Sequence, residues 1–274
     1  LKVGDGENYQ SHQPPLYYMV AAATAKLTQA DPTGPSGRTI RYLGIVFGLA
    51  TLAGVYFAAR WGTGSEVVAL AAAAFVGLNP MFLALNAAVS NDGLLFAITT
   101  WGFAVCIRIA QPGSCSRDLM WLTLLAGFGL LTKTTALVLL PLGMAAIWLQ
   151  PEARLKRIAI LLAGSLLIAS PWLVRNTLLY GDPLALRIFN EAFAGSPKTS
   201  DLVSAFGAVP YWKDWFGYWT LRSGFGAFGQ MDIFYGANVY RLLWAVALLI
   251  LAGNLLSARR QLAIPSSTRI LSWV

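Results

Sequence analysis

Two charged residues lie between long apolar segments. Placing a charge there costs free energy, so such a residue usually has a role. Asp92 falls in NAAVSNDGLL, and Lys133 is the one charged residue within 119–151, in GLLTKTTAL. A carboxylate close to hydrocarbon usually belongs to a pathway or a site, although the Ser-Asn-Asp sequence ending at Asp92 would also cap a following helix. The ammonium of Lys133 can hold a phosphate as a point charge, or extend its stem to the lipid headgroups.

A second polar group follows a later apolar segment, in SPWLVRNTLLYGDP. The guanidinium of Arg175, next to Asn176, suits an oxyanion or a carboxylate through paired donors, or else anchors the chain to lipid phosphate. His12, the only histidine, lies in YQSHQPPLYY. Without a second His or Cys nearby it supports no metal site, and a structural role and a functional one both stay open.

Several common sites are missing from the sequence. It has no glycine-rich nucleotide loop ending in Lys-Ser/Thr, no dinucleotide fingerprint and no nucleophile elbow. Cys106 and Cys115 have neither metal-ligand spacing nor the pattern of a disulfide framework. We therefore expect no cofactor and no metal ligands, while a requirement for a divalent metal stays open.

The composition indicates the elements that must position these residues. Of 274 residues 57% are hydrophobic and 12% are charged, and the mean hydropathy is +0.59. This charged fraction is about half that of a soluble domain, which argues against a water-soluble globule. The net charge of +8 is spread over short clusters between apolar runs rather than a basic stripe with aromatics, so we expect no nucleic-acid partner.

The apolar runs predict an all-α, polytopic transmembrane helix bundle. A single transmembrane domain covers 1–274, and we expect it to be incomplete at both ends. Residues 1–38 form an external loop with an interfacial helix at 14–29, residues 39–176 form six transmembrane helices, residues 177–238 form a long aromatic-rich external loop, and residues 239–258 form a further transmembrane helix. The seven apolar cores are 40–59, 67–89, 94–109, 119–132, 134–149, 158–175 and 239–257.

Basic residues are unequally divided between alternate loops, and this asymmetry predicts the orientation. Setting aside the long loop and the N-terminal segment, one set of loops carries nine Lys and Arg, and the other carries two, Lys133 and Arg175. The richer set belongs in the cytoplasm by the positive-inside rule. His12, Asp92, Lys133, Arg175 and the aromatic loop then share the external face. The nine are Arg60, Arg108, Arg117, Arg154, Lys156, Arg157, Arg259, Arg260 and Arg269.

Four motifs in order resemble those of the GT-C membrane glycosyltransferases. They are HQPPLYY at 12–18, the NP to SND segment ending at Asp92, LLTKTTAL around Lys133 and SPWLVRNTLLYGDP around Arg175. The sequence is most similar to bacterial relatives of the dolichyl-phosphate-mannose protein mannosyltransferases and of the aminoarabinose lipid A transferase. The resemblance implies a GT-C-like fold and a sugar transferase without a bound cofactor.

The resemblance also implies roles for particular residues. A carboxylate in the first external loop acts as base or binds the acceptor, and its expected place lies before Leu1. The acid matching Asp92 is the catalytic candidate within this sequence. Basic or polar groups surround the donor phosphate, which makes His12, Gln13, Lys133, Arg175 and Asn176 the substrate-binding candidates. Some relatives carry a phosphate-binding lysine where this sequence has His12 and Gln13.

We therefore expect a multi-pass protein of the bacterial inner (plasma) membrane. It moves a hexosyl or pentosyl group from a polyprenyl-phosphate carrier to a hydroxyl of a protein, lipid or glycan acceptor, with membrane lipid as a further partner. A carboxylate acts as general base, and Lys133 and Arg175 stabilise the departing phosphate. The alternative is a multi-pass transporter or lipid-handling protein without transferase activity.

Overall fold

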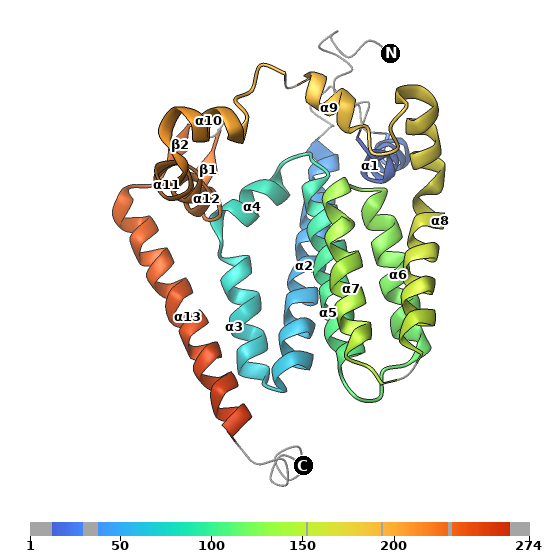
Figure 1. The fold of residues 1–274 in the computed structure, drawn as a ribbon, viewed down its shortest axis with the longest axis horizontal. Coiled ribbons are helices and arrows are strands. Elements are labelled where there is room, and N and C mark those ends of the chain that lie inside the picture. Colours follow the sequence, from blue (N-terminus) through green and yellow to red (C-terminus); the bar gives the residue numbers. More distant parts are fainter. Residues whose placement is uncertain (1–12, 30–37, 152, 193, 230–231, 264–274) are drawn as a thin grey trace. The chain divides into compact units, whose positions relative to one another are not determined.

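The fold is built almost entirely of helices, which confirms the predicted all-α class (Figure 1). The structure, a computed structural model, describes residues 13–29, 38–151, 153–192, 194–229 and 232–263. The chain divides into two compact units, residues 1–199 and 200–274. His12 lies outside the described residues.

The first unit is a helical bundle whose helices follow one another through short turns. The elements are α1 (Leu16–Leu27), α2 (Arg38–Thr63), α3 (Glu66–Gly77), α4 (Pro80–Ala87), α5 (Asp92–Ala110), α6 (Ser116–Leu130), the 3-10 helix η2 (Thr134–Val138), α7 (Leu139–Trp148), α8 (Arg154–Tyr180) and α9 (Leu186–Ala192). The predicted interfacial helix at 14–29 corresponds to α1.

Three described helices are long and apolar enough to cross a membrane. They are α2 over Thr39–Thr63, α5 and α8, and a fourth crossing is possible if α3 and α4 count as one broken span. At 1.5 Å per residue, the 19 residues of α5 extend about 28 Å, close to the thickness of the hydrocarbon core. These helices thus have the length and apolar composition that a membrane crossing requires.

The predicted continuous segment at 67–89 is corrected by a bend of 61° between α3 and α4. Asn79 accepts hydrogen bonds on Oδ1 from the backbone N–H groups of Met81 (2.9 Å) and Phe82 (3.4 Å), which caps a new helix. Pro80 occupies the first turn of that helix, where its missing N–H costs nothing. The Asn-Pro pair therefore ends one helix and starts the next.

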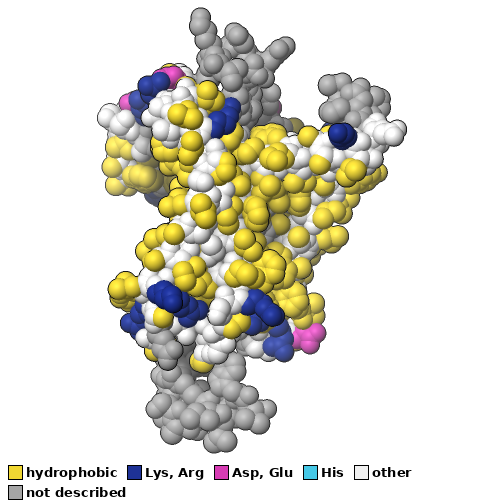
Figure 2. All heavy atoms as spheres, turned by 90° about the vertical axis from the view of Figure 1, so that its right-hand side faces the viewer, with side chains coloured by type: hydrophobic (Ala, Val, Ile, Leu, Met, Phe, Trp, Pro, Cys, Tyr) yellow, Lys and Arg dark blue, Asp and Glu magenta, His cyan; other side chains and the backbone are white. Residues whose placement is uncertain are grey.

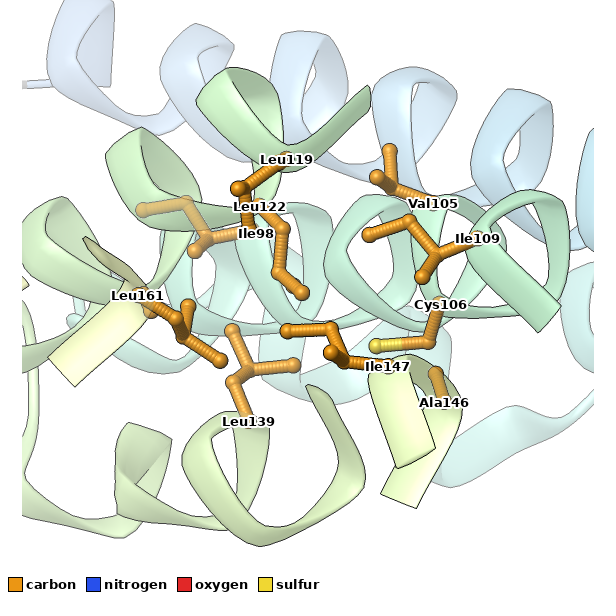
Figure 3. Packing of buried hydrophobic residues seen from close by; sticks show 11 residues of the cluster. Ile98, Val105, Cys106, Ile109, Leu119, Leu122, Leu139, Ala146, Ile147 and Leu161 are labelled. Carbon is orange, nitrogen blue, oxygen red and sulfur yellow. The ribbon is translucent and has the colours of Figure 1, made fainter. Parts of the chain in front are cut away.

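The core of the first unit lies among four helices, α5 to α8 (Figure 3). Leu122, Leu139, Ile147 and Leu161 come from three of these helices and are almost completely buried. By contrast, Leu167 on α8 is 74% exposed. Large apolar side chains on the outer surface are expected of helices that face lipid.

Helices also approach one another through small and polar residues, as in other membrane bundles. A Cβ atom placed on Gly44 of α2 would lie 1.7 Å from the backbone oxygen of Asn86 on α4, so only glycine fits there. On α8, the buried hydroxyl of Ser165 donates to the carbonyl of Thr123 on α6 at 3.2 Å. These contacts fix the spacing of neighbouring helices.

The two ends of the first unit differ in charge. The turns between α5 and α6 and between α7 and α8 lie at the lower end in Figure 1, opposite the end that holds α1. Figure 2 shows Lys and Arg side chains gathered at the lower end of a largely hydrophobic face. Arg60, Arg108, Arg117, Arg154 and Lys156 all lie near helix termini at this end.

The second unit contains the short elements of the aromatic segment followed by one long helix. They are α10 (Thr199–Phe206), α11 (Ala208–Pro210), the π-helical turn η3 (Tyr211–Gly217), α12 (Tyr218–Ser223), β1 (Ala227–Phe228), β2 (Ile233–Phe234) and α13 (Ala237–Ala263). The strands pair antiparallel, with Ala227 opposite Phe234. The predicted loop at 177–238 is corrected in two respects, because α8 continues to Tyr180 and most of the remainder is helical.

Arg222 organises the second unit around a set of aromatic rings. Its guanidinium carbon lies 4.8 Å from the ring centre of Tyr218, 5.0 Å from that of Phe234 and 4.7 Å from that of Tyr240. It also donates a hydrogen bond of 2.6 Å to the hydroxyl of Tyr218. Cation–π contacts to rings from α12, β2 and α13 hold the hairpin between the helices.

Candidate functional site

An ion pair joins the two charged residues singled out in the sequence. Lys133 Nζ lies 2.6 Å from Asp92 Oδ1, although 41 residues separate them along the chain. Their side chains are 30% and 25% exposed, so the pair is largely buried yet still reachable. The prediction that these residues share one end of the bundle is confirmed.

Local structure explains the positions of both charges. Asp92 is the first residue of α5, where the positive end of the helix dipole favours a carboxylate. Lys133 follows the last turn of α6, and its backbone N–H donates to the carbonyl of Gly129 at 2.9 Å. The negative end of a helix favours a cation. The ion pair therefore joins complementary ends of two adjacent helices.

Capping is not the main role of the Asp92 side chain. Asn91 occupies the cap position of α5, but no side chain of the cap residue bonds the helix there. Ser90 Oγ accepts from the backbone N–H of Asp92 at 3.3 Å and donates to Asp92 Oδ2 at 3.4 Å. The other carboxylate oxygen, Oδ1, accepts the bond from the ammonium of Lys133.

Asn91 connects the ion pair to the N-terminal segment, a role that the sequence analysis missed. Its Nδ2 donates to the carbonyl of Thr132 at 3.4 Å and contacts Gln13 Oε1 at 3.5 Å. The backbone N–H of Leu16 donates to the carbonyl of Leu131 at 2.8 Å. Three stretches distant in sequence thus meet around the pair. An asparagine directly before the aspartate was the one signal available.

The start of α1 is further held by aromatic packing. Tyr17 is 4% exposed, and its ring centre lies 5.6 Å from that of Tyr18 and 6.5 Å from that of Phe47 on α2. Burial, and to a smaller extent the neighbouring Tyr18, raises the pKa of the Tyr17 phenol. This tyrosine therefore stays neutral and anchors α1 beside α2.

Arg175 and Asn176 form a separate arrangement at the end of α8. The guanidinium carbon of Arg175 lies 4.4 Å from the ring centre of Trp172, and Nη1 donates to Asn176 Oδ1 at 3.1 Å. Asn176 is 1% exposed and donates to the carbonyl of Pro183 at 3.2 Å. Within the described residues no hydrogen bond or ion pair joins them to Asp92 or Lys133. This burial favours a structural role for Asn176 over the predicted substrate contact.

The turn after α8 is closed by a carboxylate. Asp182 accepts hydrogen bonds of 3.0 Å from the backbone N–H groups of Arg187 and Leu184. These bonds, that from Arg187 first, hold the pKa of the Asp182 carboxyl below its usual range. The residue thus serves the turn into α9 rather than a reaction.

Metal binding finds no support in the described part of the chain. No group of three or more His, Cys, Asp or Glu side chains there is arranged to hold an ion. Asp92 instead has a lysine ammonium as its charged partner. The polar centre at this end of the bundle therefore consists of the Asp92 carboxylate, the Lys133 ammonium and the side-chain amides of Asn91 and Gln13.

The sequence of this chain matches a known protein family. The family model of the dolichyl-phosphate-mannose-protein mannosyltransferases matches residues 12–174, more than half of the chain. The matched range includes Gln13, Asp92 and Lys133, and it ends one residue before Arg175. No curated protein and no solved structure matches the chain.

Proposed function

Because the chain belongs to the family of dolichyl-phosphate-mannose-protein mannosyltransferases, we propose that Asp92 and Lys133 form the polar centre of its sugar-transfer site. Membership in this family makes the protein a membrane glycosyltransferase whose donor is a sugar linked to a polyprenyl phosphate. The observation that carries the proposal is the 2.6 Å ion pair at the end of the bundle opposite the basic turns.

Lys133 is assigned to the phosphate of the donor. An ammonium has three N–H donors, and one of them already bonds Asp92. The other two can bond phosphate oxygens while the ion pair stays intact. As the bond to the sugar breaks, negative charge grows on the departing phosphate, and a fixed cation stabilises that charge more than the ground state.

Asp92 is assigned to the acceptor. Its carboxylate keeps lone pairs beyond those used by Lys133 and Ser90, so it can accept a hydrogen bond from an acceptor hydroxyl and position the oxygen for attack. The oxygen forms a bond to the anomeric carbon, the bond from that carbon to the phosphate oxygen breaks, and the hydroxyl proton passes to a carboxylate base. Direct displacement of this kind inverts the anomeric centre.

The location of the ion pair also favours transfer over transport. Asp92 begins α5 and Lys133 follows α6, so the pair lies at the bundle end and not halfway along the helices. Transporters typically bind their substrate near the middle of the membrane, at broken helices. We place the pair on the external face of a bacterial plasma membrane and assign a hydroxyl of a protein, lipid or glycan as acceptor.

The assay follows transfer from a labelled polyprenyl-phosphate sugar by the complete protein in vesicles. We expect Asp92→Asn and Lys133→Ala each to lose most of the activity. Glu191→Gln serves as the control. It breaks an exposed ion pair with Arg187 that has no role in the proposed reaction. Unchanged transfer in both site variants would overturn the assignment.

A labelling experiment tests the orientation independently. Two separate variants are made in a protein with Cys106 and Cys115 replaced by alanine. Lys133→Cys and Lys156→Cys each carry one thiol, and the two thiols lie at opposite ends of the bundle. We expect a membrane-impermeant maleimide to label position 133 and spare position 156 in intact cells. The reverse pattern would place the ion pair in the cytoplasm and refute an external reaction.

A further inference from the structure

A second candidate site lies at the basic end of the first unit, away from Asp92 and Lys133. It is a groove of about 450 Å³, with walls formed by α2, α5 and α6. The polar and aromatic side chains that line it are Trp61, Trp101, Arg108, Arg117, Asp118 and Trp121. Neither the family assignment nor the proposed reaction uses these residues.

Interactions within the groove hold its walls in place. Arg108 forms an ion pair with Asp118 at 3.2 Å, and its guanidinium carbon lies 4.9 Å from the ring centre of Trp61. Trp101 Nε1 donates to the carbonyl of Ala50 at 2.9 Å, which fixes α5 against α2. The indoles of Trp61 and Trp101 are therefore held in place, while that of Trp121 is 50% exposed at the groove.

The charges of the groove are unbalanced. Asp118 is 6% exposed and is already paired with Arg108. Arg117 is exposed, and among the described residues no hydrogen bond or ion pair engages its guanidinium. Two guanidinium groups and one carboxylate leave one excess positive charge beside an apolar, indole-lined surface.

This combination fits one kind of occupant, an amphiphile with an anionic head and an apolar chain. Tryptophan is concentrated where hydrocarbon meets the headgroups, and basic pockets between membrane helices bind anionic lipid headgroups. We propose that the groove binds one anionic phospholipid, whose phosphate is held by Arg117 beside Arg108 and whose acyl chain lies against Trp101 and Trp121.

Native mass spectrometry of the detergent-purified protein tests the proposal. The protein is equilibrated with an equal mixture of phosphatidylglycerol and phosphatidylcholine that carry identical acyl chains. We expect one phosphatidylglycerol to be retained preferentially. Arg117→Gln should lower its retention about fivefold, the effect of one basic residue near a headgroup. Lys156→Gln is the matched control, because Lys156 is exposed at the same end on α8 and should leave retention unchanged.

A second measurement locates the acyl chain. At one lipid per protein, phosphatidylglycerol with brominated chains quenches the tryptophans that it touches. Trp121→Phe should remove a larger share of this quenching than Trp148→Phe, because Trp148, 57% exposed on α7, lies outside the groove lining.

Three results would overturn the proposal. Equal retention of the two lipids by the unaltered protein would mean that the groove does not select charge. Equal losses in Arg117→Gln and Lys156→Gln would mean that the lipid is held by the general positive field. Retention of no lipid at all would mean that polypeptide covers the groove. Because Arg117 makes no bond among the described residues, an unchanged melting temperature is expected for its variant.

Discussion

Removing the ammonium of Lys133 is the most direct test of how the ion pair works. Lys133→Met keeps much of the side-chain length but leaves Asp92 with no charged partner at 2.6 Å. An exposed ion pair contributes about 0–1 kcal/mol, and breaking a fully buried one costs about 3–5 kcal/mol. Since the two side chains are 30% and 25% exposed, the expected loss of unfolding free energy lies between these limits, at about 2 kcal/mol.

The double variant Asp92→Asn, Lys133→Met separates an ion pair from two independent contributions. If the two residues stabilise each other, the double variant loses less stability than the sum of the single variants, because it leaves no unpaired charge. The same four proteins are compared in the transfer assay. There we expect each single change to lower the rate about 100-fold. The double change should cost little more than the worse single one, because residues that act as a unit are not additive.

The measurements are unfolding in mixed micelles and sugar transfer by each protein in vesicles. Glu191→Gln again provides the reference, since the pair of Glu191 with Arg187 is 58% and 68% exposed and should contribute under about 1 kcal/mol. Two results would refute the reasoning: additive losses of stability, or a Lys133→Met protein that folds and retains full transfer.

Three further predictions concern helix packing in the bundle and the turn that follows α8. Gly44→Ala should destabilise the bundle by about 3 kcal/mol or more through overpacking against a backbone oxygen, whereas Gly48→Ala, with 3.5 Å to its nearest neighbour, should be tolerated; detergent melting curves compare the two. Protection of the Arg187 amide from hydrogen exchange should be complete at neutral pH and fall as the pH drops through the lowered pKa of Asp182, and Asp182→Asn should abolish this dependence. Tyr180→Phe should raise stability by about 1 kcal/mol, because the buried Tyr180 hydroxyl has no hydrogen-bond partner among the described residues; a lower melting temperature would contradict this.

The sequence predicted that Asp92 and Lys133 lie at the same end of the bundle, but not that they touch. Counting basic residues and apolar runs assigns Asp92 and Lys133 to one end, because two predicted crossings separate them. It does not predict a distance, since each charge had a separate explanation as a cap or as a lipid anchor. The packing of α5 against α6 brings the two together, and it depends on side-chain shape along the helices.

Two differences between expectation and structure have different causes, one local in the sequence and one tertiary. The Asn79-Pro80 pair is a helix start within an apolar run, and hydropathy averaged over a window does not register it. The aromatic residues near Tyr218 lack a helical period of apolar positions. Their short helices are held instead by rings around Arg222, a tertiary contact that no local pattern predicts.

Arg175 and Asn176 illustrate the limit of inference from residue type. Both are polar and lie near the end of a membrane-length apolar segment, which is why the sequence suggests a phosphate site there. In the fold, however, the guanidinium of Arg175 lies against the ring of Trp172, and the side-chain amide of Asn176 donates to the carbonyl of Pro183. Residue type alone does not distinguish a side chain that binds substrate from one that binds its own chain.

The 41 residues between Asp92 and Lys133 have a consequence for biosynthesis. During synthesis Asp92 is made before Lys133. Its carboxylate therefore reaches the membrane without its cationic partner. Insertion of α5 and α6 together, as a helical hairpin, would neutralise both charges in one step and avoid that exposure. Because of this ion pair, we expect the translocon to insert α5 and α6 together.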